Sequence, residues 1–471
     1  MTVAQRWTLA VVCTATAILM LDIAVVNTAL PSIGRDLDAG MGGLQWVVDA
    51  YTLALAAVVL TAGALADRFG RRRLFACGLV VFTVASAACA AAGSIEMLHA
   101  ARAIQGLGAA ILFATSLALL ADAFPVERER TGALAAYGAT IGASFAIGPA
   151  VGGVLTTALG WRWVFLVNIP IGIAALAVTL REVRESRDPR APRVDVPGLL
   201  SFTAGLFLLV FGLLRGNEDG WGSGVIVAAL SGAAVLLVAF VAIEARSTHP
   251  MLPLHLLRSR AFTGAQLTAF AISGSFFAIY LYCSIYLQNV LGLSAIEAGL
   301  VFVPSTLVMV VVSGATAQLS QRVHPGVLVS GGLILVAIGM ALLTVAQVDS
   351  SWTALLPGIT VALIGTGLFN PSVSAVALNS VPAEQSGLAA GINDTFRQAG
   401  IAIGVAGLGA LIPTGDLLRG GSAADYVDGM HTALLAGAAL AAAGAIAGAL
   451  LIHNRTAAET ATPANVAFDA D

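Results

Sequence analysis

Lysine is absent from this sequence, and all 23 of its basic residues are arginine. A nucleotide-binding P-loop needs a lysine to reach the phosphates, and a Schiff base needs a lysine amine, so both kinds of site are excluded. Charge of either sign is also scarce, since charged residues make up 10% of the chain. The net charge of −3 is too small to indicate an acidic or a basic partner, and we expect no binding to nucleic acid.

Metal-ligating and nucleophilic residues are few as well. The four cysteines lie in apolar stretches without CxxC spacing, so they predict neither disulfides nor a metal site. The six histidines lie near the ends of apolar stretches or between them. No pattern of histidine, cysteine and carboxylate indicates a metal cluster or an activated nucleophile. We therefore expect no cofactor, no metal and no enzymatic activity.

Apolar residues, by contrast, are abundant. They make up 58% of the chain, the mean hydropathy is +0.91, and there are 51 glycines. This composition is typical of transmembrane helices, in which small residues allow the backbones to approach closely. The first apolar run has no convincing cleavage site after it, so we interpret it as a retained span and not as a signal peptide.

The apolar runs have the length of membrane-spanning helices, which need about 20 mostly apolar residues. None shows the alternating polarity of a β-barrel strand. The fourteen runs are 8–30, 44–66, 74–93, 98–121, 131–157, 163–180, 196–215, 223–244, 262–288, 295–320, 327–346, 353–378, 386–412 and 431–452. The sequence therefore predicts an all-α integral membrane protein with fourteen transmembrane helices.

Arginines concentrate in alternate loops between these runs, above all in the loop that contains Arg68 to Arg73. The positive-inside rule places these loops, and with them both termini, in the cytoplasm. An even number of helices agrees with termini on one side.

An internal repeat divides the chain. The stretch "QGLGAAILFATS" (105–116) resembles "IGTGLFNPSVS" (364–374), and both lie on the same side of the membrane. Repeats on one side indicate two parallel half-bundles. The expected division is a first six-helix half at 1–180, two extra helices with linkers at 181–261, a second six-helix half at 262–455 and a disordered tail at 456–471.

The arginine-rich loop "GALADRFGRRRLF" carries a recognisable motif. It resembles the G-x-L-a-D-r-x-G signature that the major facilitator superfamily has between helices 2 and 3. The matching residues include Gly63, Asp67, Arg68, Gly70, Arg71 and Arg72. The resemblance implies a latch that contacts a helix of the other half and holds the cytoplasmic face closed. A carboxylate suits a helix N-terminus and the glycines permit a tight turn, which agrees with that role.

Four further stretches resemble the fourteen-helix drug:proton antiporters of that superfamily. They are "LDIAVVNTALP" (21–31), "RAIQGLGAA" (102–110), "IGPAVGGVL" (147–155) and "WRWVFLVNIPIG" (161–172). The third is similar to the antiporter motif G-P-x-x-G-G, although Ser144 replaces the glycine that usually precedes it. The motif residues are Gly148, Pro149, Gly152 and Gly153. The resemblance implies a proton-driven exporter with the major facilitator fold.

Charged residues inside predicted spans are the candidates for proton coupling, because charge is costly in the bilayer and is usually functional there. Asp22 is either a coupling acid or a structural acid satisfied by a neighbouring Asn or Arg. Asp49 is a second titrating group, an acid that selects cationic substrates, or a structural residue. Arg102 either adjusts a neighbouring acid or extends to the membrane surface. Asp394 and Arg397 share one helix face, as a simple ion pair or as a pair that a proton switches.

Polar and aromatic side chains within the spans are candidates for lining a substrate cavity, although ordinary packing also explains each of them. These candidates are Asn27, Tyr51, Gln105, Phe113, Phe145, Phe276, Tyr280 and Asn370.

The predicted function is the export of small amphipathic drugs or antibiotics in exchange for protons. The alternative is a symporter or uniporter that imports a small metabolite on the same fold. A sensor or scaffold would need a cytoplasmic partner domain, and a membrane enzyme would need an active site, which the sequence does not indicate. We expect a monomer in the bacterial plasma membrane whose partners are the substrate, protons and lipid.

Overall fold

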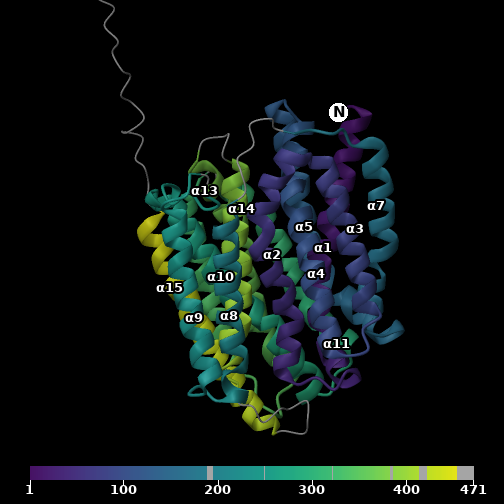
Figure 1. Cartoon of the computed structure of the whole chain (residues 1–471). Coiled ribbons are helices and arrows are strands. Elements are labelled where there is room, and N and C mark those ends of the chain that lie inside the picture. The colour runs from purple at the N-terminus through teal and green to yellow at the C-terminus, as the bar shows by residue number, and fades with distance from the viewer. Residues whose placement is uncertain (188–194, 249, 321, 382–385, 413–421, 453–471) are drawn as a thin grey trace, which may run out of the picture.

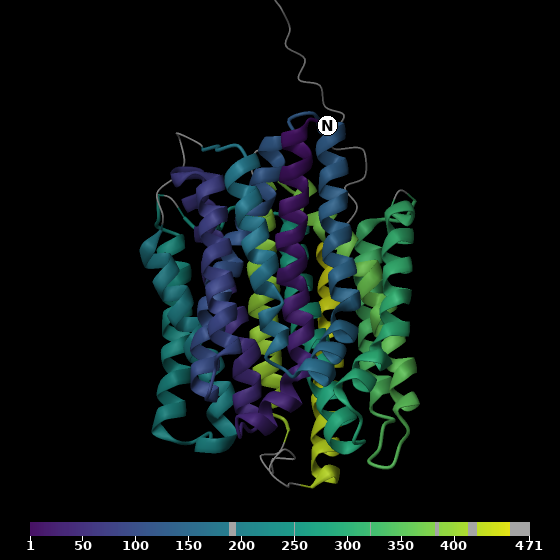
Figure 2. The ribbon, with the colours of Figure 1, turned by 90° about the vertical axis from the view of Figure 1, so that its right-hand side faces the viewer.

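The computed structural model describes the chain except for residues 188–194, 249, 321, 382–385, 413–421 and 453–471. Every regular element in the described part is a helix. The long helices run side by side in one bundle, as the two views in Figure 1 and Figure 2 show. The predicted all-α fold is therefore confirmed.

The helices follow the predicted apolar runs closely. The first group comprises α1 (Val3–Asp36), α2 (Met41–Phe69), α3 (Arg71–Ala90), α4 (Ile95–Ala123), α5 (Glu127–Leu159), the short α6 (Trp163–Leu166) and α7 (Asn168–Glu182). Two helices follow, α8 (Val196–Asp219) and α9 (Gly224–Glu244). The second group comprises the short η1 (Leu256–Arg258), α10 (Arg260–Ile285) with a π-helical end η2 (Tyr286–Val290), α11 (Ala295–Leu319), α12 (Pro325–Leu343), the short η3 (Trp352–Leu355), α13 (Leu356–Asn379), α14 (Ser386–Gly409) and α15 (Ala423–Leu451).

Twelve helical stretches of the described chain are long and apolar enough to cross a membrane. The protein is therefore a multi-pass membrane protein. The other two long helices are α5 and α14. The predicted run 163–180 is interrupted, since α6 ends at Leu166 and α7 begins at Asn168.

The two ends of the bundle differ in charge. The N-terminus and the turn between α2 and α3 lie at one end, which we call the arginine-rich end; it is at the top of Figure 1. The turns between α1 and α2 and between α3 and α4 lie at the opposite, arginine-poor end.

The two helix groups pair their helices in the same order. In the first group α1 packs against α5, α2 and α3 against α4, and α3 against α7. In the second group α10 packs against α14, α11 and α12 against α13, and α12 against α15. The groups meet through two long contacts, α5 with α11 and α2 with α14. Helices α8 and α9 pack on each other, and α8 covers the contact between α2 and α14.

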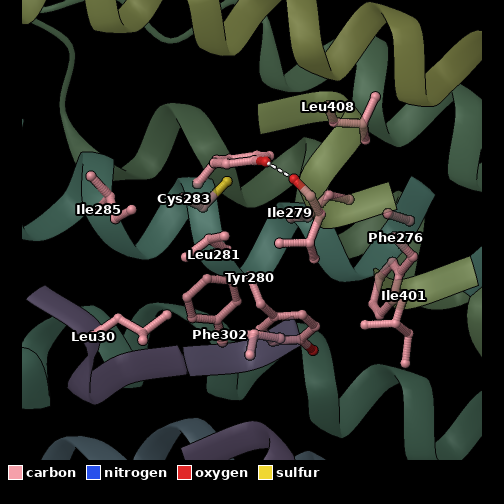
Figure 3. Packing of buried hydrophobic residues seen from close by; sticks show 14 of the residues in the cluster. Leu30, Phe276, Ile279, Tyr280, Leu281, Cys283, Ile285, Phe302, Ile401 and Leu408 are labelled. Carbon is pink, nitrogen blue, oxygen red and sulfur yellow. Dashed lines mark hydrogen bonds between the residues drawn. The ribbon is translucent and has the colours of Figure 1, made fainter. Parts of the chain in front are cut away.

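The apolar core is divided differently at the two ends. Near the arginine-poor end one cluster joins both groups, and Figure 3 shows Leu30 of α1, Phe302 of α11 and Leu408 of α14 around the side chains of α10. Toward the arginine-rich end, the first group has a cluster whose buried members, such as Phe75, all come from that group. A separate cluster around Phe262 contains residues of α9, α10, α14 and the α9–α10 linker.

Candidate functional site

A buried ion pair lies in the middle of the first helix group. The Asp22 carboxylate on α1 accepts a hydrogen bond from the Arg102 guanidinium on α4, with a distance of 2.5 Å between the oxygen and the nitrogen. The two residues are 2% and 1% exposed. Arg102 also donates from Nε to the carbonyl oxygen of Val47 on α2 at 2.9 Å, and its guanidinium carbon lies 4.2 Å from the centre of the Tyr51 ring. Arg102 therefore points into the group and does not extend to the membrane surface.

Three more polar side chains complete the surroundings of Asp22. Gln105 donates to Asp22 Oδ1 at 2.9 Å, and Asn168 of α7 donates to the same oxygen at 3.1 Å. Gln105 also accepts from Arg102 at 2.7 Å and donates to Ser86 of α3 at 2.9 Å. A buried charge with a counter-charge and a full set of hydrogen bonds ties several helices together. This geometry corresponds to the structural alternative for Asp22, an acid satisfied by Arg and Asn.

Asp49 on α2 has very different surroundings. The residue is 0% exposed, and neither carboxyl oxygen has a hydrogen-bond partner. It lies one helical turn from Gln45, whose amide donates to the hydroxyl of Tyr282 on α10 in the second group. A buried, unpaired carboxylate is unfavourable. Asp49 must therefore hold a proton here or obtain a hydrogen-bond donor when the conformation changes.

Asp394 on α14 is a buried acid of the second group. It is 6% exposed, and its Oδ2 has no hydrogen-bond partner. Among the ion pairs formed by described residues, none joins Asp394 to Arg397 within 4.0 Å, so a simple ion pair is absent in this conformation. Asp394 lies on α14, which contacts α2 of the first group.

The glycines of the predicted antiporter motif lie where α5 crosses two other helices. Gly148 and Gly152 face α1 and leave no room for a Cβ atom. Gly153 lies equally close to the backbone of α11 in the second group, and the Pro149 carbonyl lies against Gly299 of α11. Small side chains here let α5 approach both a helix of its own group and a helix of the other.

The arginine-rich loop is bound by the segment that follows α7. Gly70, with a φ of 113°, ends α2 and begins α3 in a backbone conformation that favours glycine. The Glu185 carboxylate accepts hydrogen bonds from the backbone N–H groups of Arg72 and Arg73 at 3.0 and 3.2 Å. It therefore caps the N-terminus of α3, where a negative charge is favourable.

The remaining residues of this motif have different surroundings. Arg71 lies 3.7 Å from Asp122 near the end of α4, whereas Arg68 is exposed. No atom lies within 4 Å of the Cβ position of Gly63, and the side chain of Asp67 lies outside the described residues. Arg71 lies near Asp122 of α4, and Arg72 and Arg73 lie near Glu185 in the segment that follows α7. The latch to the second group stays a prediction.

The predicted cavity residues lie in several parts of the bundle. Gln105 belongs to the Asp22 network, and the Asn27 amide donates to the carbonyl of Ile23 in its own helix at 2.9 Å. Phe276 and Tyr280 lie in the core cluster that joins both groups, as Figure 3 shows.

The other cavity candidates lie apart from that cluster. Tyr51 is fully buried beneath Arg102, and Phe113 packs on the core of the first group. Asn370 is half-buried on α13, while the side chain of Phe145 lies outside the described residues. In the described part of the chain, no group of three His, Cys, Asp or Glu side chains is placed to hold a metal ion.

Three residues with clear roles are absent from the predicted set. Asn168 lies in the "WRWVFLVNIPIG" stretch, and an amide inside an apolar run was a signal that could have identified it. Ser86 lies in a run of small residues and Glu185 in a charged loop, and neither has a spacing that indicates its partner.

Comparison with known proteins extends these observations. The family model for the Major Facilitator Superfamily matches residues 12–405. Multidrug resistance protein Stp of Mycobacterium tuberculosis is 38% identical over 397 residues, which cover 84% of this chain and 73% of that protein. Methylenomycin A resistance protein of Streptomyces coelicolor is 35% identical over 394 residues, which cover 83% and 82%.

Solved structures show the same fold. A peptide transporter, POT, in complex with sulfate superposes with a TM-score of 0.66 over 94% of this chain and 95% of that chain. The two sequences are 15% identical, so the likeness concerns the fold alone.

Proposed function

The chain belongs to the Major Facilitator Superfamily, and we propose that it exports small amphipathic drugs or antibiotics from the cytoplasm in exchange for protons. The two relatives described above are named as a multidrug resistance protein and an antibiotic resistance protein, which supports an exporter. The buried carboxyl oxygens without a partner, both of Asp49 and Oδ2 of Asp394, support coupling to protons.

The proposal includes a membrane topology. All fourteen long helices cross the bacterial plasma membrane, with the arginine-rich end and both termini in the cytoplasm. Residues 1–180 and 262–455 are the two halves, joined by the two extra helices of 181–261, while the tail 456–471 lies outside the described residues. The repeated pairing of helices in the two groups supports this division.

The contacts between the groups support a conformation closed toward the outside. Among the described residues of the two groups, four hydrogen bonds join one group to the other. They run from Gln45 to Tyr282, from Gln45 to Val405, from Gln288 to Thr28 and from Ile296 to Thr157. All four lie toward the arginine-poor end, where the apolar core is also continuous. Alternating access then requires these contacts to break when substrate leaves.

The proposed proton carriers are Asp49 and Asp394, and the proposed role of Asp22 is structural. Protonation of Asp22 would remove the counter-charge of Arg102, which has no second carboxylate among its described contacts. Asp49 and Asp394 have open carboxyl oxygens and lie on α2 and α14, which contact each other between the groups. A proton gained or lost there changes the charge where the halves move.

Inverted membrane vesicles test the proposal. An acidic interior is formed by respiration, and ethidium or methylenomycin A is added while the pH gradient is followed with a fluorescent dye. An antiporter releases interior protons when the drug is added. Asp49→Asn and Asp394→Asn remove this release, and vesicles without the protein give the baseline. Drug accumulation without proton release would contradict antiport, and proton movement in the same direction as the drug would favour the symporter.

A further inference from the structure

A hydrogen-bonded cluster joins the two helix groups near the arginine-poor end. The Gln45 amide on α2 donates to the Tyr282 hydroxyl on α10 at 3.3 Å and to the Val405 carbonyl on α14 at 3.4 Å. The Tyr282 hydroxyl itself donates to the Val405 carbonyl at 2.7 Å. We call Gln45, Tyr282 and Val405 the outer latch. Gln45 and Tyr282 are 3% and 0% exposed, so water does not compete for these bonds.

The surroundings fix the outer latch in place. A Cβ atom at Gly409 of α14 would collide with the Gln45 amide and lie 2.7 Å from the Tyr282 hydroxyl, so this glycine admits both side chains. Tyr426 of α15 donates to the Tyr282 carbonyl at 2.9 Å and holds it within the second group. The latch therefore connects α2 of the first group to a rigid part of the second.

Asp49 lies directly beside this latch. It follows Gln45 by four residues on α2, so the two side chains share one face of the helix. Its two carboxyl oxygens are unpartnered in a fully buried position. The Tyr282 hydroxyl is the titratable group of α10 that binds this face of α2, through Gln45.

The other charged or titratable groups that face α2 are engaged elsewhere. From α4, Arg102 binds Asp22 and the Val47 carbonyl, and the His99 ring lies 2.8 Å from the Gly43 carbonyl. From α8, Arg215 pairs with Asp219.

On the α14 side the charged groups are Asp394 and Arg397, which are three residues apart on one helix. None of these described groups supplies Asp49 with a hydrogen-bond donor.

We propose that Asp49 controls the outer latch: the latch stays closed while Asp49 holds a proton and opens when Asp49 loses it. The proposal deepens the proposed function, since it assigns the step by which proton binding would drive alternating access. Gln45 and Tyr282 are positioning residues in it, because they act through the charge of Asp49.

The proposed step depends on the hydrogen-bond donors that lie near the Asp49 carboxyl. When the Asp49 carboxyl releases its proton to solvent, a buried carboxylate remains that needs a hydrogen-bond donor. The Tyr282 hydroxyl and the Gln45 amide are the adjacent donors, and both now bind the Val405 carbonyl. A hydrogen bond to a charged acceptor is about twice as strong as one to a neutral carbonyl. Turning the Gln45 amide to Asp49 on its own helix removes its bonds to Tyr282 and Val405, which are the bonds of the latch that join the two groups, and the arginine-poor end can separate.

Distance measurements between spin labels test the proposal. The four native cysteines are replaced by alanine, and labels are placed at Gly93→Cys and Asp349→Cys, exposed loop positions at the arginine-poor end of the first and second groups. The protein is studied in lipid nanodiscs without drug, from mildly acidic to mildly alkaline pH. In the otherwise unchanged protein, the ratio of long to short distances should rise about tenfold over this pH range. A change of about tenfold corresponds to the free energy gained when a hydrogen bond to a neutral carbonyl is replaced by one to a carboxylate.

The variants separate the latch from a general effect of pH. Asp49→Asn should keep the short distance at every pH, and Tyr282→Phe should show the long distance at every pH. Ser275→Ala removes a buried hydroxyl that bonds only to carbonyls of its own helix, α10, so it should keep the response of the parent. A pH response that survives in Asp49→Asn, or no response in the parent, would overturn the proposal. Vesicle transport decides the exporter function independently, because the distances are measured without drug or proton gradient.

Discussion

The two helix groups bury their polar side chains in different ways. In the first group the Asp22 carboxylate receives hydrogen bonds from Arg102, Gln105 and Asn168. In the second group Asn393 of α14 donates to Gln266 of α10 at 3.1 Å, but several nearby polar atoms have no partner. Those atoms are Gln266 Nε2, Asp394 Oδ2 and Gln398 Oε1.

This difference supports the proposed division between polar residues that stabilise the fold and polar residues that take part in transport. A fully satisfied network is rigid, since any movement of its helices breaks several bonds at once. A buried polar atom without a partner destabilises the conformation that contains it, until another conformation, a proton or a ligand supplies a hydrogen bond. We therefore propose that the Asp22 network stabilises the first group. We propose that Asp49 and Asp394 take part in the transport cycle.

The largest effect is expected for Arg102→Ala, which tests whether the Asp22 network stabilises the first group. It leaves the Asp22 carboxylate buried without its counter-charge, and such a change costs about 3–5 kcal/mol. We expect a large fall in the thermal unfolding midpoint in detergent. The double variant Asp22→Leu with Arg102→Met should recover much of the loss, because it leaves no unpaired charge. Equal instability of the single and double variants would contradict the electrostatic explanation.

Two matched substitutions, Asp394→Asn and Asp22→Asn, compare the roles of the two buried acids directly. Asn has almost the same shape as Asp, so Asp394→Asn should change unfolding free energy by less than about 1 kcal/mol while proton release in vesicles is lost. Asp22→Asn should lower stability, because Arg102 keeps a buried charge without a carboxylate. The measurements are thermal unfolding and drug-dependent proton release on the same preparations. Intact proton release in Asp394→Asn would assign the coupling to Asp49 alone.

The arrangement of helices could be predicted from the sequence because the apolar runs have the length of a membrane span. Glycine and proline residues in the superfamily motifs then identified the fold. The break between α6 and α7 was not predicted, although Pro170, three residues after Val167, was a signal for it, because proline lacks the backbone N–H that continues a helix.

The candidate site was only partly predictable. The acids stood out because charge is rare in apolar runs, but their partners come from distant segments: Arg102 is 80 residues and Asn168 is 146 residues from Asp22. Composition cannot tell a paired acid from an unpaired one, so Asp22 and Asp49 looked alike in the sequence. Only the packing of α1, α4 and α7 distinguishes them.

A change at the α5–α11 contact tests how closely the two groups approach each other. Gly153→Ala places a Cβ against the Ala295 and Ile296 backbone of α11, and overpacking of this kind costs about 1–3 kcal/mol. This overpacking destabilises only the conformation in which the arginine-poor end is closed. The distances between the spin labels across that end should therefore shift toward long values. Gly132→Ala in the same helix meets no atom within 4 Å and should leave the distances unchanged. A shift of equal size in both variants would indicate a general effect on α5.

The smallest effect is expected at an ion pair outside both groups. On α8, Arg215 donates two hydrogen bonds to Asp219, at 2.9 and 2.8 Å, in a partly exposed i,i+4 pair. These bonds lower the pKa of Asp219, so the pair contributes stability above the unfolded-state pKa and loses it as the pH falls through the folded-state value. Because water and salt screen an exposed pair, Arg215→Ala should barely move the unfolding midpoint at neutral pH and not at all in strong acid. The unfolding midpoint of Arg102→Ala should fall far more than that of Arg215→Ala. Comparable losses in the two variants would show that burial does not determine how much each ion pair contributes to stability.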